Sequence, residues 1–372
     1  KPRLVSLLFG WYLDSLFIMW LFSKNIDLFT LFAPVWVIWV VLFLLPNSIL
    51  TINTPLWVWV VFVLLIDVSH VWSTIFRTYF DKEERRNHYK ILWIIPLVSF
   101  IILFTIASES SMWFWRILAY LAVFHFMKQQ YGFFALYSIP TKAKQAKRLM
   151  PDKAVLYFSM LFPVIYWHFH ARDFNWFVNN DFFHFANSFN EMWSFLIPIY
   201  FLVILGWLLE EFFLIRGNKI RFSLGRILWL LTTAANWYIG IIYFNSDLAF
   251  TTTNIIAHGV PYFVLIIYYQ NSKPKKAKTK YLPYVFATTV LLGSFAFAFS
   301  EEFFWDLLFN QDKGGVFGNF FNYSEVSNPI LVAFFLALLT LPQVVHYVLD
   351  GFIWKVNAKN PHLKEMLKPQ NG

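Results

Sequence analysis

Apolar segments of about 17 residues or more recur along the whole chain and restrict it to one class of fold. A helix rises about 1.5 Å per residue, so a segment of this length crosses the roughly 30 Å hydrocarbon core of a bilayer. Only 14% of the 372 residues are charged, against about a quarter in soluble domains, which excludes a water-soluble enzyme. We therefore predict an all-α, polytopic transmembrane helix bundle that forms one integral membrane domain over residues 1–372.

The apolar pattern predicts about eleven spans, with boundaries set where charged or turn-forming residues interrupt it. The first span contains Asp14, which makes its orientation the weakest part of the prediction. The predicted spans are residues 4–22, 28–46, 55–80, 91–107, 113–138, 153–171, 194–215, 227–244, 250–269, 283–298 and 329–354.

The distribution of Lys and Arg predicts the orientation of these spans. Basic loops alternate with loops poor in Lys and Arg, three of which contain, taken together, a single such residue, Lys313. By the positive-inside rule the basic loops lie in the cytoplasm, which places the basic tail 355–372 and the C-terminus there and the N-terminus outside. The basic loops are residues 81–90, 139–152, 216–226 and 271–282, and the loops that alternate with them are 108–112, 245–249 and 299–328.

Two long segments, 172–193 and 299–328, are rich in Phe and Asn and are predicted to be outer aromatic-rich loops at the membrane interface. The net charge is +9, but the Lys and Arg residues are distributed over the loops and do not form one basic patch. Their distribution therefore indicates the membrane topology, and no nucleic-acid partner is expected. We expect a multi-pass protein of a bacterial inner (cytoplasmic) membrane, surrounded by lipid.

Four predicted spans carry a histidine well inside the span, where such a residue is expensive unless it is paired or functional. Three others, His168, His170 and His184, lie at or beyond the outer end of span 153–171 and are predicted to be interfacial, and His88 and His362 are predicted to be solvated. All four spans run from outside to inside in the predicted topology, and each histidine stands eight to thirteen residues before the cytoplasmic end. These offsets place all four imidazoles at a similar depth, about 12 to 20 Å from that end. The residues are His70, His125, His258 and His346, and we predict that they bind a metal.

Two aspartates share a helix face with these histidines. Asp67 precedes His70 by three residues and Asp350 follows His346 by four, so each carboxylate is either a further metal ligand or a group that orients the ligating ring. Gln129 stands in the same relation to His125, and Asn236 lies at the same depth on another span. We predict that Asp67, Asp350, Gln129 and Asn236 serve catalysis, with the two amides facing substrate or oxygen; Asn236 has the alternative of joining helices.

The chain has no cysteine, so thiolate sites are impossible and any metal is held by nitrogen and oxygen. Carboxylate and histidine one turn apart on two helices, with further ligands from other helices, is a device that soluble di-iron and di-manganese bundles also use. Imidazole and carboxylate ligands suit iron, zinc or copper, and one or two ions are both admissible. Iron is preferred, because a water-poor aromatic site suits the activation of oxygen.

These features predict a membrane-bound metalloenzyme, a non-haem iron oxidoreductase that hydroxylates, desaturates or oxidatively cleaves a lipid or other lipophilic substrate. A zinc-dependent membrane hydrolase, a metal- or proton-coupled transporter and a haem carrier are the alternatives. Nucleotide-binding glycine loops, HExxH, GxSxG and HxxHH are absent from the sequence. The hydrophobic substrate is expected to enter sideways from the bilayer, and a polar co-substrate or electron donor from the cytoplasm.

Overall fold

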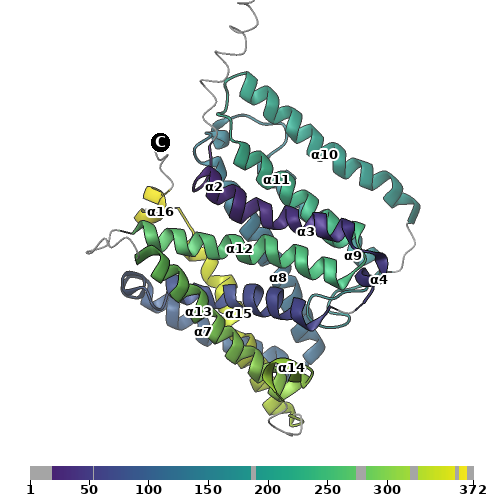
Figure 1. Cartoon of the computed structure of the whole chain (residues 1–372), viewed down its shortest axis with the longest axis vertical. Helices are drawn as coiled ribbons and strands as arrows, with labels where there is room; N and C mark the ends of the chain where they lie inside the picture. Colours follow the sequence, from purple (N-terminus) through teal and green to yellow (C-terminus); the bar gives the residue numbers. More distant parts are fainter. Residues whose placement is uncertain are drawn as a thin grey trace, which may run out of the picture.

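The computed structural model describes residues 19–52, 54–185, 190–273, 282–318, 326–356 and 360–366. Within these ranges the regular structure is entirely helical, as predicted. The long helices pack side by side, with α12 (Asp247–Ser272) near the centre of the view (Figure 1).

Seven helical segments of the described residues are long and apolar enough to cross a membrane, which makes the chain a multi-pass membrane protein. Two of the seven are composite, because short stretches of π-helix join their α-helical parts. The seven segments are α2–η1–α3 (Lys24–Leu44), α5–η2–α6 (Leu56–Arg77), α7 (Lys82–Glu109), α10 (Asn190–Arg216), α12, α13 (Leu282–Trp305) continued by η5 (Asp306–Asn310), and α15 (Pro329–Ile353).

Three further long helices coincide with predicted spans but are not among those seven: α8 (Ser111–Ser138), α9 (Asp152–Phe169), and α11 (Leu224–Trp237) continued by η4 (Tyr238–Tyr243). The first predicted span, 4–22, lies almost entirely outside the described residues. The total of about eleven spans and the cytoplasmic C-terminus therefore stay predictions. The short helices are α4 (Asn47–Leu50), η3 (Ala143–Gln145), α14 (Gly314–Phe317) and α16 (Pro361–Met366).

Burial distinguishes the central helices from those that face lipid. The most apolar window of α12 is 72% buried, whereas those of α7 and α10 are 22% buried. The exposed face of α7 carries large apolar side chains such as Trp93, Leu97 and Ile101. Such a surface is stable only in contact with lipid or a partner, in keeping with a membrane protein.

Successive long helices alternate in direction, so their connections fall at two ends of the bundle. One end, here called the basic face, contains the loops 78–81, 139–151 and 217–223; the backbone N–H of Arg221 donates to Thr141 O there at 2.9 Å. The other end, here called the opposite face, contains residues 170–185, 245–246 and 311–318. Arg172 and Asn245 tie two of its connections together, through Ile242 O and Asp173.

The two predicted outer loops differ from each other in the structure. Residues 172–185 are irregular, and α10 begins at Asn190. Residues 299–310, by contrast, continue the helix α13–η5 beyond residue 298, where we predicted the end of the span, because the apolar run resumes after Glu301 and Glu302. Parts of the predicted loops and basic segments lie outside the described residues, namely 186–189, 319–325, Lys275, Lys276, Lys278, Lys280, 357–359 and 367–372.

Candidate metal centre

The structure brings the four predicted histidines together in the core of the bundle. One ring nitrogen from each of His70, His125, His258 and His346 lies within 4.8 Å of the corresponding atom of every other. All four side chains are buried, none more than 4% exposed. They come from α6, α8, α12 and α15, so helices far apart in sequence converge on one point.

The rings are packed directly against one another. Their centroids lie 4.5 Å apart for His70 and His258, 5.0 Å for His70 and His346, 5.1 Å for His125 and His258, and 4.7 Å for His125 and His346. Nε2 of His346 is 3.1 Å from Nε2 of His125. This packing leaves no plane between the rings for a haem macrocycle, so the geometry disfavours the haem alternative.

Two of the four rings lack any hydrogen-bond partner among the described residues. Both nitrogens of His70 and both nitrogens of His258 are buried and unpaired. A buried polar atom without a partner costs about 1–3 kcal/mol, so native proteins rarely leave four together. Lone pairs converging on one point are what a cation with nitrogen ligands requires, and the residues present therefore fit a metal ion.

A hydrogen-bond chain orients the ring of His346. Tyr262 donates its hydroxyl proton to Oδ1 of Asp350 at 2.6 Å. The oxygen of Tyr262 is then free to accept from Thr74, at 2.9 Å, and Thr74 in turn accepts from Nδ1 of His346, at 2.7 Å. This direction of donation puts the proton of His346 on Nδ1 and leaves a lone pair on Nε2, the nitrogen that faces His125.

Aromatic rings restrain two other histidines. Phe126 stacks on His258 with centroids 3.6 Å apart and planes 10° from parallel, and Tyr347 stacks on His125 at 4.3 Å and 22°. The stacking therefore restrains the orientation of both rings. Such preorganisation lowers the cost of assembling a metal site.

The backbone around His258 is shaped by a proline. Pro261 has no N–H, so the carbonyl of Ala257, four residues earlier, lacks its helical partner. Gln130 of α8 donates to that carbonyl at 2.9 Å, and Gln129 donates to the carbonyl of His258 at 2.8 Å. The two glutamines therefore hold α12 against α8 beside the cluster.

A glycine allows the close approach of α12 to η2 (Trp59–Val68) at the same level. A Cβ at Gly259 would lie 2.6 Å from Cγ2 of Ile66, which no side chain tolerates without movement. Asp67 follows Ile66 directly, and η2 passes into α6 just before His70. The π-helical stretch thus leads straight into the metal centre, a position where such stretches are frequent.

Neither predicted aspartate is a member of the four-histidine group. Asp67 Oδ1 lies 3.6 Å from Nδ1 of His70, and the carboxylate is 31% exposed. Asp350 lies 3.8 Å from Nδ1 of His346 and 3.9 Å from Nε2 of His125, and is engaged by Tyr262. Asp350 is joined to His346 through Tyr262 and Thr74, whereas Asp67 lies beside His70 without a hydrogen bond to it.

The two predicted amides have different positions. The amide nitrogen of Gln129 is used on the backbone of α12, while its Oε1 is buried without a partner among the described residues. Asn236 donates to Thr253 O and accepts from Trp39 Nε1, both at 3.0 Å. It therefore joins α3, α11 and α12, the alternative to facing substrate.

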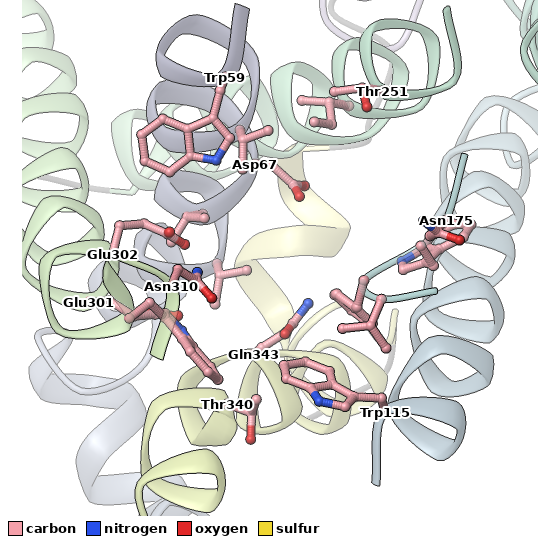
Figure 2. Close-up of a pocket in the computed structure, with 18 of the residues that line it drawn as sticks. Trp59, Asp67, Trp115, Asn175, Thr251, Glu301, Glu302, Asn310, Thr340 and Gln343 are labelled. Carbon is pink, nitrogen blue, oxygen red and sulfur yellow. The ribbon is translucent and has the colours of Figure 1, made fainter. Parts of the chain in front are cut away.

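A partly open cavity of about 640 Å³ reaches the cluster at His70. It extends toward the opposite face, where Ser111, Asn175 and Asp247 line it. Asp67 and Gln343 point toward its open centre, and Trp115 and Asn175 form the far wall (Figure 2). This cavity lies on the other side of the histidines from the basic face, where we expected the polar co-substrate to enter.

A second, smaller cavity of about 170 Å³ reaches His346 from the side, between α6, α7 and α15. Its wall is apolar, with Trp72, Ile75, Pro96 and Leu341 among the lining residues. It lies at the lateral position where a substrate coming from the bilayer is expected.

The remaining histidines lie apart from the cluster. His168 is bonded to Tyr120 at 2.7 Å and His170 to the carbonyl of Tyr166 at 2.9 Å, and His184 lies in the irregular segment of the opposite face. His88 pairs with Glu84. This agrees with their reading as interfacial or solvated residues.

Four neighbours of the site were not predicted to belong to it: Thr74, Phe126, Glu301 and Glu302. Thr74 stands four residues after His70, the helical spacing that could have indicated it. The two glutamates line the larger cavity and lay in a segment that we assigned to an outer loop.

Comparison with known proteins adds no identification, since no family model, curated protein or solved structure matches this chain.

Proposed function

We propose that this protein is a membrane-embedded metalloenzyme in which His70, His125, His258 and His346 hold one ion and a lipophilic substrate is oxidised beside it. The observation that carries the proposal is the convergence of four buried imidazoles, two of which have no other partner. A bound cation would take one lone pair from each ring, and so would give His70 and His258 a partner that they otherwise lack.

The number of histidines supports iron over zinc. Four histidines would close a tetrahedral zinc site, but leave two positions open on a six-coordinate ion, as catalysis with oxygen needs.

Bound iron would supply the activation of dioxygen, and the protein's own residues would supply position and exclusion of water. Thr74, Tyr262 and Asp350 hold the ring of His346 in one tautomer. Phe126 and Tyr347 cover the rings of His258 and His125. The cavity at His70 would hold the part of the substrate that reacts.

The three reactions in this class differ in their demand for electrons. Cleavage of a C=C bond by dioxygen yields two carbonyl groups and needs no donor. Hydroxylation and desaturation each consume two electrons and two protons in addition, and release one or two molecules of water. Only these two reactions require a cytoplasmic electron donor. An acidic donor protein would be attracted to the basic face, where Lys142, Lys144 and Lys147 are exposed.

We further propose the inner membrane of a bacterium as its location, since the alternation of basic and non-basic loops is the signature of helical proteins in such membranes. Fractionation of the native host, with detection in the inner-membrane fraction, tests this. Recovery of the protein from another compartment would overturn it.

The decisive experiment is elemental analysis of protein purified in detergent, followed by incubation with host lipid extract under ¹⁸O₂. We expect about one iron per chain and mass shifts of label in a lipophilic product. If the protein contains zinc in place of iron, and hydrolyses a lipid without incorporating ¹⁸O from dioxygen, the oxidoreductase proposal is wrong and the protein is a zinc-dependent hydrolase. Absence of any metal after supplementation with iron, zinc and copper would overturn the metalloenzyme proposal.

A further inference from the structure

We propose that the 640 Å³ cavity is a binding chamber for a lipophile whose polar group is uncharged or cationic, a hydroxyl or an amine, and that it rejects acidic lipids. The inference rests on the proposed function and names the substrate class of the same site. The volume of the cavity lies within the range of about 300–1,000 Å³ typical of small-molecule sites.

The charges of the wall carry the argument. Four carboxylates line the cavity, Asp67, Asp247, Glu301 and Glu302, and none of the described lining residues is Lys or Arg. Lys313 lies over the ring of Trp59 at the wall, but its ammonium is paired with Asp312. Away from the metal centre, an anionic head group would therefore lose its hydration without gaining a counter-charge from any described lining side chain, which costs several kcal/mol.

Beside His70, which the proposed function assigns to the metal, a second buried polar group, Asn254, supports a ligand in the chamber. His70 is 2% exposed and Asn254 is 6% exposed, and both line the cavity. The nitrogens of His70 and the Oδ1 of Asn254 have no hydrogen-bond partner among the described residues. The amide oxygen accepts hydrogen bonds only, so it is suited to a hydroxyl or an amine and not to a carboxylate or phosphate.

The remaining wall suits the apolar body of such a molecule. Indole and phenyl rings face the cavity from several helices, among them Trp59, Trp115, Trp176, Phe126 and Trp305. Trp115 and Trp305 lie 5.8 Å apart between ring centroids, so they form a continuous aromatic surface. Rings of this kind bury large apolar area with little loss of side-chain entropy.

The position of the polar groups orients the ligand. Asp247, Asn175 and the exposed Asn310 lie at the opposite face, whereas His70 and Tyr347 lie at the deep end. Glu301 accepts from Trp72 Nε1 at 2.6 Å, which holds one carboxylate at the wall between these ends. Asp67 and Gln343 point into the chamber from different helices, as Figure 2 shows.

The test uses three tritiated probes with the same chain: hexadecan-1-ol, hexadecylamine and hexadecanoic acid. Saturable binding to immobilised protein in detergent is measured with and without iron. We expect the alcohol and the amine to bind at least tenfold more tightly than the acid. Equal or tighter binding of the acid overturns the proposal.

Paired variants assign the binding to the chamber. Val332→Trp fills the cavity and should abolish saturable binding, whereas the neighbouring Leu331→Trp, on a side chain 48% exposed, should not. Glu302→Gln should reduce the preference for amine over acid severalfold, and Glu109→Gln, exposed and not among the lining residues, should not. Binding that survives Val332→Trp places the ligand elsewhere and overturns the proposal.

The result is separable from that of the metal. Selective binding by protein that retains no metal under any condition would uphold the chamber and refute the metalloenzyme. Metal retention together with binding that does not distinguish the three probes would uphold the metal centre and refute the chamber.

Discussion

His125 and His346 lie 221 residues apart in sequence, yet their Nε2 atoms are 3.1 Å apart. Two lone pairs at this distance repel each other unless a proton or a cation lies between them. The chain of hydrogen bonds through Thr74 assigns the proton of His346 to Nδ1, so the lone pair on Nε2 is available to a cation. The predictions below follow from this relationship and from the surroundings of the cluster.

Replacement of any one of the four clustered histidines by Ala should lower the metal content of purified protein at least tenfold, because each ring supplies one ligand atom. His168→Ala, His170→Ala and His184→Ala serve as controls and should retain the metal. Elemental analysis at equal protein concentration gives the comparison. Equal loss in both groups would show that the centre lies elsewhere.

Thr74→Val and Tyr262→Phe should weaken metal binding about 10- to 100-fold, since partners that orient a ligating histidine have effects of this size. Each variant keeps the shape of the side chain and removes one hydroxyl of the chain to Asp350. Metal affinity is measured by competition with a chelator. Thr105→Val, on an exposed residue of α7, is the control, and unchanged affinity in both test variants would contradict the role of the chain.

The two aspartates should behave differently. Asp350→Ala removes the acceptor at the end of the hydrogen-bond chain and should lower metal affinity about as much as Tyr262→Phe. Asp67→Ala removes a partly exposed carboxylate of the cavity wall and should leave the metal bound while lowering turnover or ligand binding. Metal content and turnover are measured on the same samples. Loss of metal from the Asp67→Ala variant, with metal retained by Asp350→Ala, would indicate that Asp67 is itself a ligand.

Topology can be tested by cysteine labelling, since the chain has no cysteine of its own. Lys144 on the basic face and Asn179 on the opposite face are both exposed. Lys144→Cys should react with an impermeant maleimide only from the cytoplasmic side, and Asn179→Cys only from the other. The reverse labelling pattern in oriented vesicles would show that the protein has the opposite orientation in the membrane.

Acid stability should depend on Asp81, which lies in the connection between α6 and α7. Burial by itself would raise the pKa of this carboxyl, but hydrogen bonds from Lys273 and Gln270 outweigh it and hold the pKa below its usual value. A carboxyl whose pKa is lowered by folding stabilises the protein above the unfolded pKa of about 3.9 and loses this contribution as the pH falls through the folded value.

Asp81→Asn should therefore lower the melting temperature at pH 7, and the difference from the parent protein should shrink below about pH 4. Asn can preserve the helix cap that Asp81 provides to Glu83 and Glu84, but its NH2 group cannot accept from Gln270 and Lys273, so the variant reports the loss of the charge together with these two bonds. Asp312→Asn, in an exposed ion pair, is the control and should change the melting temperature little. A difference that persists at pH 3 would contradict this account.

The sequence by itself determined the class of fold and the members of the histidine cluster. Apolar segments long enough to cross a bilayer leave a chain with no choice but a helical membrane bundle, and ionisable residues inside such segments are few enough to count. The depth of His70, His125, His258 and His346 followed from helical rise alone, because position along a helix is a local property.

Only the tertiary structure decided which side chains face one another. The rotation of each helix depends on packing with distant neighbours, so the use of Asn236 between α3 and α12, and of Gln129 on the backbone at His258, could not be read from spacing. Thr74 and Tyr262 meet His346 for the same reason. The cavity, too, is a gap among several helices, so its acidic wall and its opening toward the opposite face exist only once those helices are assembled.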